Sequence, residues 1–160
     1  MAKDNLSAHH LDQVDKAILN LLQEDSRYTT KQLSAQLNLS PTPIYERVKR
    51  LEQEGYIRKY VALLDKQKLG KGLIVFCNVS LKEHANPLGE KFVNQILSLP
   101  EVVECYNISG QYDFMLKVLV SDMPEYQNFI IHKLAALENI GSTHSIFVMG
   151  EIKYSTTVPL

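Results

Sequence analysis

Residues 29–55 read TTKQLSAQLNLSPTPIYERVKRLEQEG and predict two short helices separated by a tight turn. The first helix starts at Thr29, which stands three residues before a glutamine, the spacing of a capping box, and it must stop near Asn38. The second starts at Ser40, a serine cap followed by prolines that only a first helical turn tolerates. It meets Gly55, the residue type expected just past a helix end.

Two short helices linked by only Asn38-Leu39-Ser40 are typical of a helix-turn-helix, with Leu39 expected to fill the turn. An ordinary helical hairpin is the alternative. In the second helix, the apolar residues Ile44, Val48 and Leu51 share one face, and Arg47 flanks it. The other face presents Thr42, Tyr45, Glu46, Lys49, Arg50 and Gln53. Alone, such a face is usually just solvated.

The distribution of charge favours a polyanionic partner for this region, although the net charge of the chain is only −1. All four arginines, at positions 27, 47, 50 and 58, lie in the first 60 residues. Residues 1–62 hold nine Lys and Arg against eight Asp and Glu, whereas residues 63–160 hold eight against ten. Arginine matches phosphate geometry, so its confinement to one segment, taken with the short turn, favours DNA over a merely solvated face.

A helix is also predicted before this pair, and an extended segment after it. Leu11, Val14, Ile18 and two later leucines have helical spacing, which predicts a helix from about Asp12 to Gln23 with Asp12 as its N-cap. Residues 56–64 are extended and rich in bulky side chains, and we interpret them as a strand or wing.

The hydrophobic period changes after residue 72. Strands are predicted at 73–81, 102–108, 113–120 and 141 to about 154, with helices at 87–99 and from Asp122 onward. The order βαββαβ is the ferredoxin-like unit, so the whole chain is expected to be α+β. The expected domains are a winged helix-turn-helix at 1–61, a linking strand or hinge at 62–71 and a ferredoxin-like domain at 72–160.

The predicted sheet is apolar on both faces. Leu73, Val75 and Cys77 alternate with Ile74 and Phe76, so neither face of the first strand is polar. The third and fourth strands show the same mixture. We infer that helices cover one face and a second copy of the protein covers the other.

Catalysis, metal binding and membrane insertion have little support. His84, His132 and His144 lie on separate predicted elements, His9 and His10 lie at the N-terminus, and no nucleophile elbow or phosphate-binding loop is present. Cys77 and Cys105 have neither zinc nor disulfide spacing. The longest apolar run, 73–77, is far too short to cross a bilayer, and residues 1–10 lack the core of a signal peptide. We therefore expect a soluble cytoplasmic protein with no catalytic residue, metal or cofactor.

Residues 109–113, Ser-Gly-Gln-Tyr-Asp, allow two interpretations. In the structural one, Gly110 supplies the positive φ of a tight turn and Asp113 binds local backbone amides. In the functional one, Tyr112 and Asp113 place an aromatic ring and a charge where the strand leaves its turn. A second polar cluster, Ser142, Thr143, His144 and Ser145, opens the last strand. Together the clusters suit a zwitterion, with Asp113 for the ammonium group and amides and hydroxyls for the carboxylate.

Several longer runs are similar to one family. The runs LSPTPIYERVKRLEQEGYIRKY (39–60) and ALLD (62–65) closely resemble the DNA-binding half of the Lrp/AsnC family, the leucine-responsive or feast/famine transcription regulators. The runs SGQYDFMLKV (109–118), SDMPEY (121–126) and FVMGEIKYSTTVPL (147–160) resemble its C-terminal half. The resemblance covers nearly the whole chain, and it is far more specific than a generic helix-turn-helix match.

The resemblance implies a winged helix-turn-helix, a linking strand and a ferredoxin-like domain called RAM. Family members dimerise through the RAM sheet, often form tetramers or octamers, and frequently bind an amino acid between RAM domains. Carried over to this chain, the effector-binding residues are Ser109, Gly110, Tyr112, Asp113, Met123, Ser142, Thr143 and His144.

The resulting hypothesis is a homodimeric or larger DNA-binding transcription regulator with an amino-acid effector. The helix after the turn enters the major groove, with Thr42, Tyr45, Glu46 and Lys49 nearest base edges and arginines on phosphates. The predicted DNA-binding residues are Ser40, Thr42, Pro43, Tyr45, Glu46, Arg47, Lys49, Arg50 and Arg58. The alternative is an architectural DNA-binding protein without an effector, and an enzyme ranks far below both.

Overall fold

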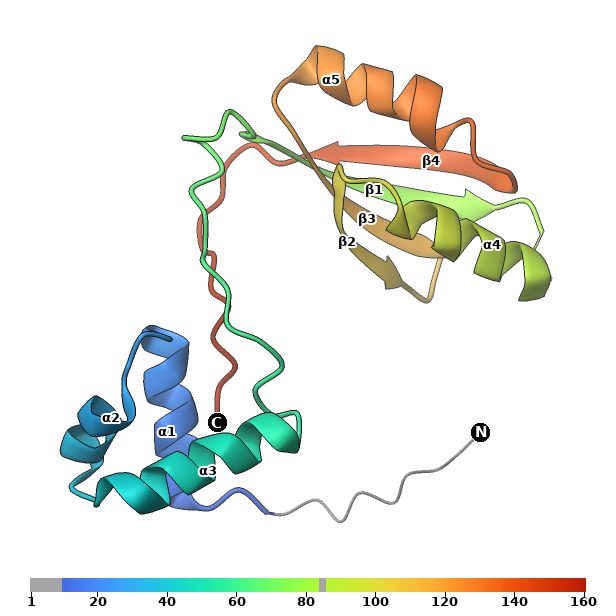
Figure 1. Cartoon of the computed structure of the whole chain (residues 1–160). Helices are drawn as coiled ribbons and strands as arrows, with labels where there is room; N and C mark the ends of the chain where they lie inside the picture. Colours follow the sequence, from blue (N-terminus) through green and yellow to red (C-terminus); the bar gives the residue numbers. More distant parts are fainter. Residues whose placement is uncertain (1–9, 84–85) are drawn as a thin grey trace. The chain divides into compact units, whose positions relative to one another are not determined.

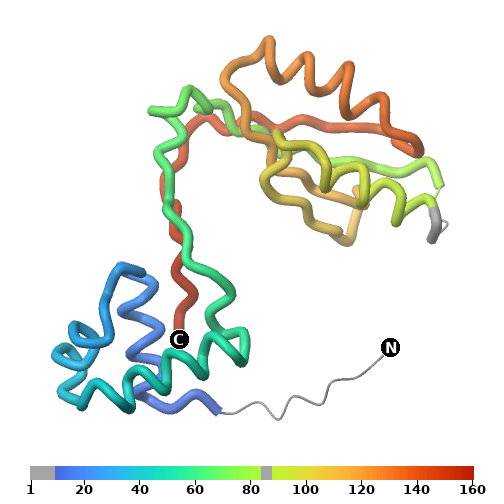
Figure 2. Tube along the Cα trace, in the orientation of Figure 1, coloured from blue at the N-terminus to red at the C-terminus, as the bar shows by residue number. Residues whose placement is uncertain are grey.

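The computed structural model describes residues 10–83 and 86–160, which form two compact units (Figure 1, Figure 2). One unit holds the described residues up to Leu63 together with Lys153–Leu160, and the other holds Leu64–Ile152. The last residues thus join the N-terminal unit, although the sequence suggests a place in the C-terminal domain. In the described residues, no helix has the length and apolar character needed to cross a membrane.

Three capped helices build the N-terminal unit: α1 (Gln13–Glu24), α2 (Thr30–Leu37) and α3 (Pro41–Gln53). The side chain of Asp12 accepts the Asp15 N–H at 2.8 Å, and that of Thr29 accepts the Gln32 N–H at 3.3 Å, so these two predicted N-caps are confirmed. Ser40 is the N-cap residue of α3, but its side chain makes no capping hydrogen bond. The apolar faces of the helices meet in one core, formed by Ile18, Leu19, Leu33, Ile44 and Leu51.

The turn between α2 and α3 is built by polar groups. Asn38 adopts a left-handed conformation with φ 53°, and the hydroxyl of buried Ser34 donates to the Leu39 carbonyl. Leu39, expected to fill the turn, keeps 38% of its surface exposed, so that expectation is wrong. Because Asn38 turns the chain and Ser34 satisfies its backbone, the turn needs no apolar side chain.

The chain leaves α3 through Gly55, whose φ of 78° confirms the predicted helix stop. The sequence predicted a strand or wing at 56–64 and a linking strand or hinge at 62–71; residues 56–72 form no strand and contain only turns, bends and irregular backbone. A strand needs a neighbour for its backbone hydrogen bonds, and in the described residues the paired strands begin only at Leu73.

The C-terminal unit is a four-stranded antiparallel sheet with strand order β2-β3-β1-β4, as the ferredoxin-like prediction requires. Helix α4 follows β1, and α5, which continues as a π-helix, η1, follows β3 (Figure 1). The bounds are β1 (Leu73–Leu81), α4 (Asn86–Leu97), β2 (Val102–Asn107), β3 (Phe114–Val120), α5 (Met123–Asn128), η1 (Phe129–Leu134) and β4 (Ile140–Phe147).

Both helices pack on one face of this sheet. Phe92 of α4 lies with its ring centroid 4.9 Å from that of Phe114, and the Tyr126 hydroxyl of α5 lies 2.6 Å from the Ser145 hydroxyl of β4. This core consists of Val75, Cys77, Val79, Leu81, Phe92, Ile96, Phe114, Leu116, Val118, Val120, Tyr126, Phe129 and Leu134.

The opposite face of the sheet, which we call the open face, takes the alternate residues of each strand. Phe76 and Ile146 are paired in the β1–β4 register and lie there side by side, with Ile146 46% exposed. Lys117 lies beside Phe76 on β3 and makes a 2.6 Å ion pair with Glu104 of β2. The open face therefore carries apolar side chains on β1 and β4 and an ion pair on β2 and β3.

Strand β4 is shorter than predicted. It ends at Phe147, whereas the pattern suggested about Tyr154, and residues 148–160 have no regular structure. Its last register pair with β1 is Phe147 with Val75, and beyond it the Val148 N–H still donates to the Ile74 carbonyl at 3.1 Å.

Acid should weaken the C-terminal unit through Glu125. Its carboxylate accepts from Lys71 Nζ at 2.6 Å and from the Ser121 N–H at 2.7 Å, and these contacts, Lys71 foremost, lower its pKa to about 2. A carboxyl that is more acidic in the folded state stabilises above its ordinary pKa, and this stabilisation is lost as the pH falls towards 2.

Glu125→Gln should therefore lower the free energy of unfolding at pH 7 by about 1 kcal/mol and flatten its decline between pH 5 and 2. Urea unfolding at pH 7, 4 and 3 measures both effects. Glu138→Gln is the control, because Glu138 is 64% exposed in its ion pair with Lys91 and should change little. A decline with pH identical to that of the wild type would contradict the assignment.

Candidate nucleic-acid interface and ligand site

The outer face of α3 exposes the side chains that the sequence assigns to DNA bases. Thr42, Tyr45, Glu46 and Lys49 are all exposed, with Tyr45 at 56%. Such donors, acceptors and an aromatic ring on a protruding helix can contact base edges in a major groove. The structure thus brings these four predicted residues onto one accessible surface.

The remaining predicted DNA contacts flank this surface. Ser40 is exposed at the N-cap of α3, and its side chain makes no capping hydrogen bond. Pro43 is half-buried in the first turn, and Arg58 is exposed beyond the helix. A free serine hydroxyl at a helix N-terminus and an exposed guanidinium both suit phosphate oxygens.

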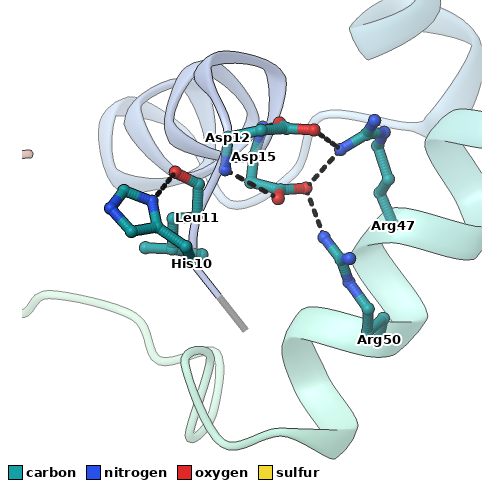
Figure 3. Close-up of polar contacts among 6 residues, drawn as sticks. All are labelled: His10, Leu11, Asp12, Asp15, Arg47 and Arg50. Atoms are coloured by element: carbon teal, nitrogen blue, oxygen red, sulfur yellow. Dashed lines mark hydrogen bonds and ion pairs between the residues drawn. The ribbon is translucent and has the colours of Figure 1, made fainter. Parts of the chain in front are cut away.

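Arg47 and Arg50 are held by carboxylates of α1 (Figure 3). One oxygen of Asp15, Oδ1, accepts a hydrogen bond from Arg47 Nη1 at 2.7 Å and forms an ion pair with Arg50 Nη2 at 2.6 Å. Asp12 Oδ2 accepts from the same Arg47 nitrogen at 2.6 Å. The two arginines predicted to contact phosphates therefore already pair with two acids of their own domain, and DNA contact by them stays a prediction.

Asp15 is the most buried charge in this group, with only 1% of its surface exposed. The Asp15 N–H and the nearby Arg47 guanidinium lower the pKa of Asp12, and the carboxylates of Asp12 and Asp15 raise the pKa of Arg47. Arg47 thus stays protonated and Asp12 ionised at neutral pH, which keeps the ion pair charged.

The chain after α3 is tied back to that helix by a contact that the sequence analysis missed. The Tyr60 hydroxyl donates to Glu52 Oε1 at 2.8 Å. Burial, followed by the Glu52 carboxylate, raises the pKa of Tyr60 to about 12. The spacing of eight residues across a glycine gives no helical signal, so only the fold reveals this pair.

The predicted ligand loop lies between β2 and β3. Gly110 has φ 125°, which confirms the positive φ expected there, and Ser109 is exposed beside it. Asp113 accepts the Leu81 N–H on Oδ2 at 2.7 Å, and its own N–H donates to the Val79 carbonyl at 2.9 Å. Asp113 thus binds backbone of a neighbouring strand, as the structural interpretation of the loop requires, while its side chain is only partly buried.

The second predicted cluster lies next to this loop. The rings of Tyr112 and His144 stack with centroids 6.0 Å apart and an angle of 19° between their planes. Ser142 and Thr143 precede His144 on β4 and are exposed. The fold therefore brings together two clusters that are about 30 residues apart in the sequence.

Met123 does not join this group within one chain. It begins α5, beyond the last residue of β3, whereas Asp113 stands just before the first. A strand of this length separates them by roughly 20 Å. Met123, which is 43% exposed, can contact the same ligand only if a neighbouring copy supplies it.

Comparison with known proteins identifies this architecture. Residues 74–158 match the Lrp/AsnC ligand binding domain, and residues 11–58 match a winged helix-turn-helix DNA-binding domain. The chain belongs to the Lrp/AsnC family. It is therefore a DNA-binding transcription regulator with a ligand-binding domain, and not an enzyme.

Individual Lrp/AsnC relatives resemble this chain over most of its length. The leucine-responsive regulatory protein of Escherichia coli is 40% identical over 145 residues, which are 91% of this chain and 88% of that protein. A transcriptional regulator of Neisseria meningitidis, solved as a complex with L-Met, is 35% identical with a TM-score of 0.90 and covers 94% of this chain and 97% of its own. An AsnC family regulator of Agrobacterium tumefaciens is 37% identical with a TM-score of 0.89, and the match covers 92% of this chain and 96% of that regulator.

The ligand-binding domain of this Lrp/AsnC protein also has a groove that the sequence analysis did not identify. It encloses about 610 Å³ between α4 and the strands, and Asp113 borders it. Its other lining residues are Leu81, Gly89, Glu90, Val93, Asn94, Asn107 and Phe114. Glu90 and Asn94 lie one helical turn apart, which is the spacing that could have indicated a shared polar face.

Neither thiol is placed for chemistry. Burial raises the pKa values of Cys77 and Cys105, which makes both weak nucleophiles. Over 10–83 and 86–160, no three His, Cys, Asp or Glu side chains are grouped as a metal site would need. His9 and His84 lie outside the described residues.

Proposed function

We propose that this protein binds a palindromic DNA site as a homodimer or larger assembly and that an amino acid bound in its C-terminal domain controls this binding. The supporting observation is the meeting of Tyr112 and His144 beside Asp113, on a domain joined to an exposed recognition helix. The regulator acts on chromosomal DNA, which places it in the cytoplasm.

The chemistry of the ligand cluster fits a zwitterion. Asp113 can pair with an ammonium group while keeping its hydrogen bond from Leu81, since a carboxylate accepts several donors. The exposed hydroxyls of Ser109, Ser142 and Thr143, with the Gly110 N–H, can bind a carboxylate. The Neisseria meningitidis relative was solved with L-Met, so an amino acid with an apolar side chain is the first candidate. No other cofactor is proposed.

For DNA, we assign base contacts to Thr42, Tyr45, Glu46 and Lys49, which share the exposed face of α3. The long, flexible side chain of Lys49 can also pair with a phosphate next to its base. Ser40 and Pro43, at the helix start, are next to the DNA backbone in this arrangement. Because carboxylates already hold Arg47 and Arg50, we assign phosphate contacts chiefly to Lys49 and exposed Arg58.

Self-association follows from the open face of the sheet, where a second copy would cover Phe76 and Ile146. A symmetric dimer presents two recognition helices. This arrangement suits two DNA half-sites separated by one turn of the DNA, which is about 10 base pairs, or by a multiple of one turn. Larger assemblies, tetramers or octamers, add affinity by effective concentration. A ligand controls DNA binding only if it binds one assembly more tightly than another.

The effector site is tested by thermal unfolding with each of the twenty amino acids. At 100 times its Kd, an effector should stabilise the wild type by about 3 kcal/mol and raise its Tm. Asp113→Asn keeps an oxygen for the Leu81 N–H but loses the charge, so it should fold and lose this response. Asp113→Ala should also cost about 1–3 kcal/mol of stability, because it leaves the Leu81 N–H without that acceptor.

Two results separate the alternatives. If no amino acid shifts the wild-type Tm while DNA binding persists, the architectural protein without an effector is correct. If the effector raises the Tm of Asp113→Asn as much as that of the wild type, Asp113 does not bind the ligand and only stabilises the loop.

The DNA contacts are tested on a duplex selected from random sequences by the wild-type protein. Lys49→Gln and Arg58→Gln should each reduce the slope of the logarithm of the DNA-binding constant against the logarithm of the salt concentration by about 1. The reason is that each variant loses one contact with a phosphate. Lys68→Gln, an exposed lysine of the other unit, is the control and should leave the slope unchanged. Unchanged slopes in both variants would remove these residues from the interface.

Self-association through the open face is tested by light scattering. Ile146→Glu should reduce the assembly mass and, with it, the DNA affinity, because a buried charge opposes contact between copies. Leu97→Glu is the matched control, since Leu97 is 75% exposed on α4, away from that face, and its variant should keep the mass. A wild-type monomer, or an Ile146→Glu assembly of unchanged mass, would refute this interface.

A further inference from the structure

The ion pairs between α1 and α3 are built around one buried carboxylate (Figure 3). The Asp15 side chain is 2% exposed. One of its oxygens accepts a hydrogen bond from Arg47 and forms an ion pair with Arg50, and its other oxygen accepts the Asp12 N–H at 3.2 Å. The acids are three residues apart on α1 and the arginines three residues apart on α3. Each pair therefore lies on one helix face, and the two faces meet.

Both arginines point into the domain rather than towards solvent. Their side chains are only 29% and 37% exposed. Arg50 Nε is buried and finds no hydrogen-bond acceptor among the described residues. Two arginines against two acids leave this group neutral, so it adds little to the attraction that DNA phosphates exert on the domain.

We propose that Asp15 is a positioning residue for DNA recognition: through Arg47 and Arg50 it fixes the rotation of α3 about its axis. This role rests on the proposed DNA contacts of α3. Apolar packing by Ile44 and Leu51 is non-directional, whereas the charged hydrogen bond from Arg47 to Asp15 is directional, and the Arg50 ion pair holds the same carboxylate from the next turn of α3.

The consequence of rotation is large at the reading surface. Side chains of a helix reach about 5–6 Å from its axis, so a turn of about 20° moves Tyr45 or Lys49 by about 2 Å. Hydrogen bonds to base edges tolerate only a few tenths of an ångström. Loss of the Asp15 charge should therefore weaken sequence recognition while leaving general attraction to DNA intact.

The test compares Asp15→Asn with the wild type on the selected duplex and on a scrambled duplex. The affinity of the full-length variant for the selected duplex should fall by about 10- to 100-fold, the loss expected for one or two disturbed base contacts. Its affinity for the scrambled duplex should change by no more than about twofold, with an unchanged salt slope. Asp25→Asn removes the same charge from an exposed pair with Arg27 and should leave both affinities within about twofold.

Arg50→Gln gives an independent answer and carries the test if Asp15→Asn proves unfolded by circular dichroism. This variant leaves Arg47 paired with Asp15. If Arg50 positions α3, the loss is confined to the selected duplex and the salt slope stays constant. If Arg50 instead contacts a phosphate, both duplexes lose affinity alike and the slope falls by about 0.9, which overturns the proposal.

Two further outcomes are decisive. If Asp15→Asn binds both duplexes more tightly by the same factor, Asp15 only competes with phosphate for the two arginines. This result would overturn the positioning role. If Asp15→Asn prefers the selected duplex as strongly as the wild type does, the positioning role is overturned but the proposed DNA contacts are not. A wild type that selects no sequence would overturn the proposed DNA contacts as well.

Discussion

A charge buried between two helices must be neutralised, and this constraint organises the DNA-binding unit. Asp15 is almost fully inaccessible, so its carboxylate is costly unless cations reach it. The arginines of α3 meet that need, and they thereby join the recognition helix to α1. The same carboxylate accepts the N–H of Asp12 and so completes the cap of α1. The start of one helix and the orientation of another thus depend on one side chain.

In the C-terminal unit, the corresponding constraint is a sheet that is apolar on both sides. The helices satisfy one face through Phe92 and Phe129, which are buried. The other face keeps Ile146 accessible next to Phe76, with the ion pair of Lys117 and Glu104 on the far side of Phe76. Self-association and DNA recognition are linked on this account, because a dimer built through the sheet doubles the number of recognition helices.

Local signals in the sequence predicted the fold well. The caps at Asp12 and Thr29 and the positive φ of Gly55 and Gly110 depend on neighbouring residues, so a single sequence contains them. The order of strands and helices followed from hydrophobic period in the same way. Strand limits did not: β4 ends at Phe147, and the pattern of residues 148–154 does not reveal this end.

The sequence predicted only part of the candidate sites, because some of their contacts join residues that are far apart in the chain. The exposed face of α3 follows from helical geometry, whereas the partners of Arg47 lie 32 to 35 residues away on another helix. A paired acid spacing on α1 and a paired arginine spacing on α3 were visible in the sequence, but nothing local says that the two faces meet. The stacking of Tyr112 on His144 likewise exists only once the sheet is formed.

The central claim is that the Asp15 contacts persist when the protein binds DNA. A crystal structure of the full-length protein on its selected duplex tests this most directly. If Asp15 positions α3, Arg47 and Arg50 remain within hydrogen-bond distance of Asp15 while Lys49 and Arg58 approach phosphates. Either of the first two guanidinium groups found on a phosphate, with Asp15 left unpaired, would contradict it.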